Sequence, residues 1–422
     1  MRALSHIRIC DFTGQLAGAG ATRTLAAFGA QVIRIEDPVT QGRWDILRGM
    51  APFVDERRGP ELGGGFQNHN VEKLGITLNL RTQRGRALLR RLVEIGDVVA
   101  ENFATGVLAR MGFPWEELRR IRPDLIYVSN RGFGHRGPYA SFKSFGVSVR
   151  ASAGRTWGPI VQAVCGLSFS SGLPDQLPAG WGYSYMDHHG ANLMALAILS
   201  GLVHRASTGE GQWIDMSCTD AGGALLGPVV LDDSVNGRGL RRPGMPHSNR
   251  SQSPAMAPHG IYPSHGEDCW VAIACRDDTD FGRFIAVAGT PGLADARWQT
   301  LSARLEAEDD LDALVADWTR ARSKQDAAAA LRTVGVPAAP VLTPAERIDQ
   351  EPTTAAWGLW PAVEHREMGR LRVDGLPVHL GCTDWRIERG APLLGQDNEY
   401  VYGELLGIDG DEIMALRQEG VV

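Results

Sequence analysis

Apolar and polar positions alternate with two different periods over the first 36 residues of the chain. Residues 7–12 and 31–36 alternate with a period of two, which predicts strands, and the small residues at 18–28 between them predict a helix. The same order returns later, with strands predicted at 75–80, 97–101 and 124–129 and a helix at 82–95. Strands that alternate with helices form parallel sheets covered by helices. The first half of the chain is therefore predicted to be α/β, with a Rossmann-like sheet.

After these strands a helix is predicted over residues 191–203, because Leu193, Leu196 and Leu199 recur at a spacing of three. Residues 236–263 are rich in Gly, Pro, Ser, Asn and Arg and follow no period, which is typical of a linker or an active-site loop. A smaller second domain is predicted from strands at 270–275 and 338–342 and helices at 278–289 and 311–335. A short surface helix is predicted at 411–416, near the end of the chain.

Composition and charge exclude several classes of protein. A length of 422 residues suggests two or three domains, and a formal net charge of −6 gives no electrostatic basis for binding nucleic acid. The six cysteines are scattered without a C-x-x-C pair, which predicts reduced thiols and no metal site. The apolar run at 191–203 is shorter than the roughly 18 residues that a membrane span needs, and no signal-peptide core precedes Asp11. A soluble, cytoplasmic protein without membrane association is expected.

A carboxylate, Asp187, stands directly before the helix predicted at 191–203. The free N–H groups of a first helical turn and the helix dipole are expected to keep this carboxylate ionised. An ionised carboxylate in such a position can act as a nucleophile, although capping is the commoner role of a single Asp before a helix. The adjacent His188 and His189 would point about 100° apart on a helix, so they do not form a chelating pair.

Two further motifs are incomplete. Gly18-x-Gly20 follows the first predicted strand as in a dinucleotide site, but Arg23 stands where the third glycine belongs. Ser184 approaches the G-x-S-x-G nucleophile elbow of hydrolases, with Met186 in place of the second glycine. A thioesterase or hydrolase with Ser184 as its nucleophile therefore stays open as an alternative.

Several separate motifs resemble those of one family and occur in the family's order. They are Leu16-Ala17-Gly18, residues 25–36, residues 68–80, Glu101-Asn102-Phe103, residues 106–112, Gly132-Phe133-Gly134, Gly137-Pro138-Tyr139, residues 208–212 and Ala391-Pro392-Leu393-Leu394-Gly395. Together they cover nearly the whole chain. By these motifs the sequence resembles the class III CoA-transferases, the formyl-CoA transferase or carnitine-dehydratase-like family of CaiB/BaiF type.

The resemblance implies a transferase that moves CoA from an acyl-CoA thioester to a free carboxylic acid. Asp187 falls on the family's catalytic aspartate, which would pass through an acyl-aspartyl anhydride and an aspartyl-CoA thioester. Coenzyme A would enter as substrate, with no metal and no permanently bound cofactor. The positions implied to bind CoA are Ala17, Leu78, Asn102, Phe103 and Arg110, with Lys143 and Arg155 as alternatives for a further basic contact.

The resemblance also implies an architecture and partners. Residues 1–225 and 336–422 would form a large α/β domain and residues 226–335 a smaller α+β domain, in chains that interlock as a homodimer or as a heteromer with a homologous subunit. Trp181, Tyr183 and Tyr185 beside Asp187 favour a dicarboxylate or an aryl-substituted acid such as benzylsuccinate, with succinyl-CoA as donor.

The sequence departs from the family pattern at three places. Leu16 stands where some members have a Gln near the reacting carboxylates, and Asp37 where some relatives have a basic residue for CoA. Acyl-CoA racemases share the fold but carry a catalytic His in the segment where this chain has Thr156-Trp157-Gly158. A racemase is therefore the less favoured reading of the same CoA-binding fold.

Overall fold

The computed structural model describes residues 2–141, 157–173, 175–181, 184–243 and 245–422, which form two compact units. Unit 1 comprises Met1–Phe169, Ala179–Gly237 and Thr353–Val422, and unit 2 comprises Ser170–Pro178 and Arg238–Pro352. Unit 1 is thus assembled from both ends of the chain. The domain boundaries predicted near residues 225 and 335 stay predictions.

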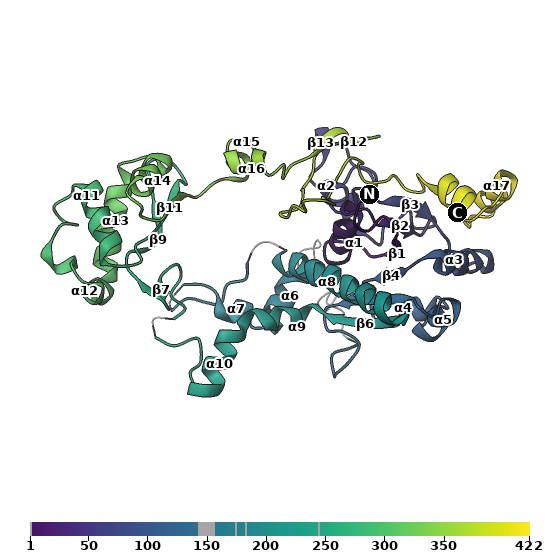
Figure 1. Cartoon of the computed structure of the whole chain (residues 1–422), viewed down its shortest axis with the longest axis horizontal. Helices are drawn as coiled ribbons and strands as arrows, with labels where there is room; N and C mark the ends of the chain where they lie inside the picture. The colour runs from purple at the N-terminus through teal and green to yellow at the C-terminus, as the bar shows by residue number, and fades with distance from the viewer. Residues whose placement is uncertain (1, 142–156, 174, 182–183, 244) are drawn as a thin grey trace. The chain divides into compact units, whose positions relative to one another are not determined.

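Six parallel strands form the centre of unit 1 (Figure 1). Their order across the sheet is β3-β2-β1-β4-β5-β6, and each neighbouring pair runs parallel. The strands are β1 (Arg8–Phe12), β2 (Gln31–Glu36), β3 (Leu74–Thr77), β4 (Val98–Glu101), β5 (Ile126–Arg131) and β6 (Gln212–Ser217). The first five are almost completely buried, as parallel strands covered on both faces are. The predicted α/β fold with a largely parallel sheet is confirmed.

Helices cover both faces of this sheet. On one face α1 (Ala17–Ala27) and α8 (Tyr185–Thr208) pack through small and aliphatic side chains such as Ala21, Leu25 and Ile198. The other face is covered by α3 (Gln83–Ile95), α5 (Trp115–Ile121), the π-helical segment η5 (Glu399–Leu405) and α17 (Gly410–Gln418). The last two bring the C-terminal segment onto a sheet that the N-terminal segment begins.

Shorter elements complete unit 1 and its connections to unit 2. They are η1 (Ile46–Gly49), η2 (Val54–Glu56), α2 (Gly64–Asn70), α4 (Val107–Arg110), α6 (Trp157–Val164), α7 (Leu167–Ser170), α9 (Cys218–Gly223), η3 (Ala224–Leu226), α10 (Gly227–Asn236), α16 (Pro352–Ala356), β12 (Ala362–His365) and β13 (Gly369–Arg372).

Unit 2 contains a three-stranded antiparallel sheet in the order β11-β10-β9 around an aromatic core that includes Phe281, Phe284 and Trp318. Its elements are β7 (Ser251–Gln252), β8 (Ala255–Met256), β9 (His259–Pro263), β10 (Trp270–Ala274), α11 (Asp278–Ala288), η4 (Ala296–Trp298), α12 (Leu301–Glu306), α13 (Glu308–Arg320), α14 (Lys324–Thr333), β11 (Ala338–Pro340) and α15 (Pro344–Asp349).

Two expectations for this part of the chain were wrong. The helix predicted over 311–335 is two helices, α13 and α14, because Ser323 caps the second by accepting a hydrogen bond from the backbone N–H of Asp326. The segment 236–263, predicted to be an irregular loop, contains β7, β8 and β9. The strands were not predicted because Gly and Pro are typical of loops, and because strands this short contain too few residues to show alternation.

Candidate active site at the carboxyl edge of the parallel sheet

The strand order places a topological switch point between β1 and β4, where ligands bind in open parallel sheets. Asn102, which follows β4, joins the loops that leave these two strands. Its side-chain Nδ2 donates to the backbone carbonyl of Gly14 at 2.9 Å, and its Oδ1 accepts from the Gly14 N–H at 2.8 Å. Asn102 therefore orders the backbone on both sides of the switch point.

The first turn of α1 approaches these loops closely. A Cβ atom at Gly18 would lie 2.5 Å from Cβ of Thr13 and 2.8 Å from Cγ of Asn102, so only glycine fits. Ala17, the first residue of α1, stands next to this contact. The small residues at the start of α1 thus allow the helix to reach the switch point.

The side chain of Glu101, at the end of β4, fixes the loop that follows this strand. It is fully buried, and its Oε2 accepts the N–H of Phe103 at 2.6 Å. Its Oε1 accepts from the Tyr127 hydroxyl at 2.9 Å and from Nη2 of Arg131 at 2.8 Å. Asn102 and Phe103 are therefore fixed through a buried carboxylate with partners on β5.

A pocket of about 460 Å³ opens beside the switch point and brings three of the predicted CoA-binding residues together. Its lining includes Leu78 after β3, Phe103 after β4 and Arg110 at the end of α4. The indole of Trp44 also lines it, with its ring centroid 4.9 Å from that of Phe103. Trp44 lies outside the recognised motifs and was not predicted from the sequence. The pocket thus combines two aromatic rings with a cation.

Three guanidinium groups line this pocket, those of Arg81, Arg86 and Arg110. Asp37 lines it too and pairs with Arg81 at 3.3 Å. The pocket therefore has an acidic residue after β2, while arginines reach it from the segment after β3 and from α4. Guanidinium groups suit phosphate because they donate paired hydrogen bonds in one plane.

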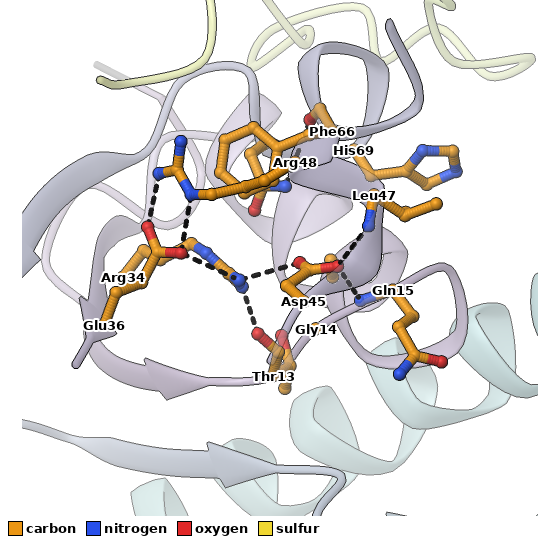
Figure 2. A network of polar contacts seen from close by, with 12 residues as sticks. Thr13, Gly14, Gln15, Arg34, Glu36, Asp45, Leu47, Arg48, Phe66 and His69 are labelled. Atoms are coloured by element: carbon orange, nitrogen blue, oxygen red, sulfur yellow. Dashed lines mark hydrogen bonds and ion pairs between the residues drawn. The ribbon is translucent and has the colours of Figure 1, made fainter. Parts of the chain in front are cut away.

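A buried charge network of Arg34, Glu36, Asp45 and Arg48 is shown in Figure 2. Asp45 follows Trp44 in the chain, so the network holds the loop that carries this pocket-lining residue. Nη2 of Arg34 contacts Asp45 Oδ2 at 2.8 Å, and Nε of Arg48 donates to Glu36 Oε1 at 2.7 Å. Burial alone would raise the pKa of Glu36, but the charges of Arg34 and Arg48 outweigh it and lower this pKa. The four side chains are almost completely buried, so their mutual pairing is what makes burial tolerable.

The same network reaches the loop after β1. Oδ1 of Asp45 accepts the backbone N–H of Gln15 at 3.1 Å, and Arg34 donates to the carbonyl oxygen of Thr13. The side chain of Gln15 extends away from Asp45 (Figure 2). Burial raises the pKa of Asp45, while Arg34 opposes the rise. The loops that follow β1 and β2 are thereby fixed relative to each other.

Asp187 lies in the first turn of α8, which begins at Tyr185 with Ser184 as N-cap. The helix was expected to begin at 191; it starts earlier because His188, His189 and Gly190 belong to its first turns without showing the apolar period. α8 ends at Thr208 just before β6, so it runs antiparallel to the strands and its first turn lies at their carboxyl ends.

The carboxylate of Asp187 faces the sheet side of α8. Asp187 precedes the buried Ala191 by four residues and the buried Met194 by seven, which places all three on one helical stripe. Within the described part of the chain its carboxylate has no hydrogen-bond partner, and burial raises its pKa to about 6. The group is still mostly ionised at pH 7, but it is more basic than a helix terminus alone would make it.

Two residues at neighbouring strand ends lie close to the first turns of α8. The thiol of Cys218 donates to Oδ1 of Asn130 at 3.1 Å, and burial followed by the charge of Asp187 raises the pKa of this thiol to about 12. A Cβ atom at Gly190 would lie 2.7 Å from the Cys218 sulfur and 3.8 Å from Nδ2 of Asn130. That Nδ2 is buried without a hydrogen-bond partner. An amide donor is therefore available about one turn from Asp187.

The predicted site residues fall into three places. Leu78, Phe103 and Arg110 line the pocket, whereas Ala17 and Asn102 lie at the switch point. Asp187 is not among the pocket-lining residues, but its helix packs on α1, where a Cβ atom at Gly20 would lie 3.2 Å from that of Ala191. The alternatives Lys143 and Arg155 lie outside the described residues.

Within the described ranges, no three or more His, Cys, Asp or Glu side chains gather in a way that could hold a metal ion. The described helices also include none that is both long and apolar enough to cross a membrane. All six cysteines fall in the described ranges and are free thiols.

The chain is similar to known proteins over nearly its whole length. Residues 4–398 match the family described as CoA-transferase family III. A succinyl-CoA–D-citramalate CoA-transferase from Chloroflexus aurantiacus is 32% identical over 422 residues, which is 100% of this chain and 98% of the relative. A succinate–glutarate CoA-transferase from Agrobacterium fabrum is 32% identical over 408 residues, 96% of each chain.

A solved structure gives the same result for the fold. The crystal structure of a CAIB/BAIF family protein from Brucella suis is 31% identical and superposes with a TM-score of 0.81, covering 96% of this chain and 99% of that one. The resemblance found from the sequence motifs is confirmed, and the chain belongs to CoA-transferase family III.

Proposed function

We propose that this protein transfers CoA from an acyl-CoA thioester to a free carboxylic acid, with Asp187 as the nucleophile. The observation that carries the proposal is the carboxylate of Asp187, which faces the carboxyl edge of the sheet, has no hydrogen-bond partner among the described residues and has a pKa raised to about 6 by burial. A partly desolvated carboxylate is a stronger nucleophile than a hydrated one and is still ionised at neutral pH.

The proposed reaction has four steps. The Asp187 carboxylate attacks the donor thioester carbonyl and expels CoA thiolate, which leaves an acyl-aspartyl anhydride. The thiolate attacks the aspartyl carbonyl of this anhydride, releases the donor acid and gives an aspartyl-CoA thioester. The acceptor carboxylate attacks that thioester and forms a second anhydride with release of the thiolate. The thiolate then attacks the acceptor acyl carbonyl, so that the new acyl-CoA leaves and Asp187 is restored.

We propose that CoA occupies the pocket beside the switch point. Phe103 with Trp44 can hold the adenine ring, and the guanidinium of Arg110 can pair with a phosphate. Leu78 would contribute apolar contact, and Ala17 leaves room for the ligand beside the backbone at Asn102. Lys143 or Arg155 remains the proposed further basic contact.

The substrate class is proposed from the acids in the relatives' names and from the aromatic residues near Asp187. Citramalate, succinate and glutarate are all dicarboxylates. The rings of Trp181 and Tyr185 meet edge to face with centroids 4.4 Å apart at the start of α8. We therefore propose a dicarboxylic or aryl-substituted acid such as benzylsuccinate as acceptor, with succinyl-CoA as donor.

We also propose that the protein assembles as an interlocked homodimer or as a heteromer with a homologous subunit. Leu196 and Val203 on the outer side of α8 are 58% and 71% exposed, and Val230, Leu231 and Val235 on α10 are 60%, 62% and 70% exposed. Large apolar side chains that gather on helices in this way are typical of surfaces that another chain covers.

The test is to trap the covalent intermediate. The protein is incubated with succinyl-CoA, quenched with hydroxylamine or borohydride, and digested for peptide mass mapping. We expect a donor-dependent mass change on the peptide that holds Asp187, and none in an Asp187→Ala variant. Ser184→Ala is the matched control, because a thioesterase with a Ser184 nucleophile would lose its activity and the proposed transferase would keep it. An unmodified Asp187 with donor bound would refute the mechanism.

A further inference from the structure

Arg23 carries a buried positive charge that nothing in the described part of the chain neutralises by direct contact. The residue is 7% exposed, and its Nε and Nη2 have no hydrogen-bond partner. Burial lowers the pKa of its guanidinium, and the charge of Asp374 opposes this effect. A charged group removed from water is stable only when it is paired, so an arginine in this state is suited to an anion that arrives as a ligand.

The carboxylate of Asp374, whose charge acts on Arg23, is already engaged. Oδ2 of Asp374 accepts from Nδ2 of Asn68 at 2.6 Å, and the Asp374 N–H donates to Oδ1 of Asn68 at 2.8 Å. In the described part of the chain, Nε and Nη2 of Arg23 make no hydrogen bond to Asp374, which acts on Arg23 through its charge alone. Asp374 therefore lowers the local potential without occupying the donor groups of Arg23.

Two histidines complete the surroundings, and both are neutral at pH 7. The His69 and His188 rings lie with centroids 5.8 Å apart, and Nδ1 of His69 bonds to the carbonyl oxygen of Gly65 at 2.9 Å. Burial lowers the pKa of His69 to about 4 and also lowers that of His188. In the cluster formed by Arg23, His69 and His188, the positive charge therefore belongs to Arg23.

The cluster adjoins the proposed nucleophile. His188 follows Asp187 directly, so the two side chains leave the first turn of α8 about 100° apart. Gly20, one turn before Arg23 on α1, faces both Ala191 and His69, which shows that this side of α1 meets α2 and α8. The charge of Arg23, which lies on α1, acts on His188, the residue that follows Asp187 on α8, so the buried cation lies on the side of α1 that meets the first turns of α8.

We propose that Arg23 binds the second carboxylate of a dicarboxylic substrate, while the first carboxyl reacts at Asp187. The inference rests on the proposed function of Asp187 and adds a residue that selects the substrate. A guanidinium can hold a carboxylate through two parallel hydrogen bonds, which fixes the orientation of the acid as well as its charge. Because His69 and His188 are neutral, Arg23 is the residue of this cluster that attracts the substrate carboxylate.

The test compares two donors of equal chain length, succinyl-CoA and butyryl-CoA, in wild type and in an Arg23→Gln variant. We expect the ratio of kcat/KM for succinyl-CoA to that for butyryl-CoA to fall by about 100-fold or more, because a desolvated charge pair is lost for one donor alone. The matched control is Arg370→Gln, which removes the same charge from an exposed position on β13 and is expected to leave the ratio unchanged. An unchanged ratio in Arg23→Gln would overturn the proposal, and so would an equal loss with both donors.

A binding measurement keeps the proposal testable if the variant folds poorly. Isothermal titration of wild type with succinate and with butyrate should give at least about tenfold tighter binding of succinate. Equal affinities would refute the carboxylate site.

The Asp187→Asn variant separates the role of Asp187 from that of Arg23. Transfer that survives Asp187→Asn would refute the proposed function. If transfer is lost in Asp187→Asn and the donor ratio is unchanged in Arg23→Gln, only the role of Arg23 is refuted.

Discussion

Replacement of Asp187 by Asn should stabilise the start of α8 at neutral pH while it abolishes transfer. Burial raises the pKa of Asp187 from 3.8 to about 6, a rise of about two units. Since one unit corresponds to about 1.4 kcal/mol, the ionised carboxylate costs the folded state about 3 kcal/mol. Asn has the same shape and no charge, so the variant does not carry this cost.

The sign of the pH dependence follows from the direction of the shift. Below about pH 3 the carboxyl is protonated in both folded and unfolded chains, and its titration costs nothing. Between about pH 3 and pH 7 the unfolded chain is the more fully ionised of the two, so the wild type loses stability as the pH rises. The stability of Asp187→Asn relative to wild type should therefore increase by about 3 kcal/mol from about pH 3 to about pH 7.5.

The assay is hydrogen exchange of the α8 amides, compared between variants at each pH so that the intrinsic exchange rate cancels. This local measurement suits a chain of two units, whose global unfolding is not expected to be two-state. The matched control is Asp220→Asn, because Asp220 is an exposed aspartate in the first turn of α9. A difference that stays constant with pH, or that Asp220→Asn reproduces, would refute the reasoning. Wild-type kcat/KM should also show an acid limb near pH 6.

Three further changes test the surroundings of the site. Glu36→Gln removes the charge that buried Arg34 and Arg48 share and leaves Arg48 only Glu61 as a carboxylate partner, so it should lower the local stability of the surrounding segment by about 3 kcal/mol, measured by hydrogen exchange; unchanged exchange would contradict the network's role. Gly18→Val would place atoms on Thr13 and Asn102 and should destabilise the protein by about 1 to 3 kcal/mol, with weaker CoA binding by titration. Arg110→Gln should raise the KM for acyl-CoA about tenfold with a smaller change in kcat, and an equal effect on a pantetheine thioester would exclude a phosphate contact.

The sequence by itself determined the local elements and the class of protein. Strand β2 was predicted with its observed bounds, because alternation of apolar residues with a period of two is a property of neighbouring residues alone. The family followed from short motifs that lie in order along nearly the whole chain. Asp187 and the residues Leu78, Phe103 and Arg110 were singled out from those motifs, and the last three do line one pocket.

The tertiary structure decided which distant residues meet. The Trp44 ring packs against that of Phe103, and Asp37 pairs with Arg81, because the loops after β2, β3 and β4 begin at one edge of the sheet. No local pattern marks Arg23 as unpaired, since the packing of α1 against α2 and α8 is what removes it from water. The pKa of Asp187 is likewise a property of the folded chain, because desolvation depends on atoms brought together from separate segments.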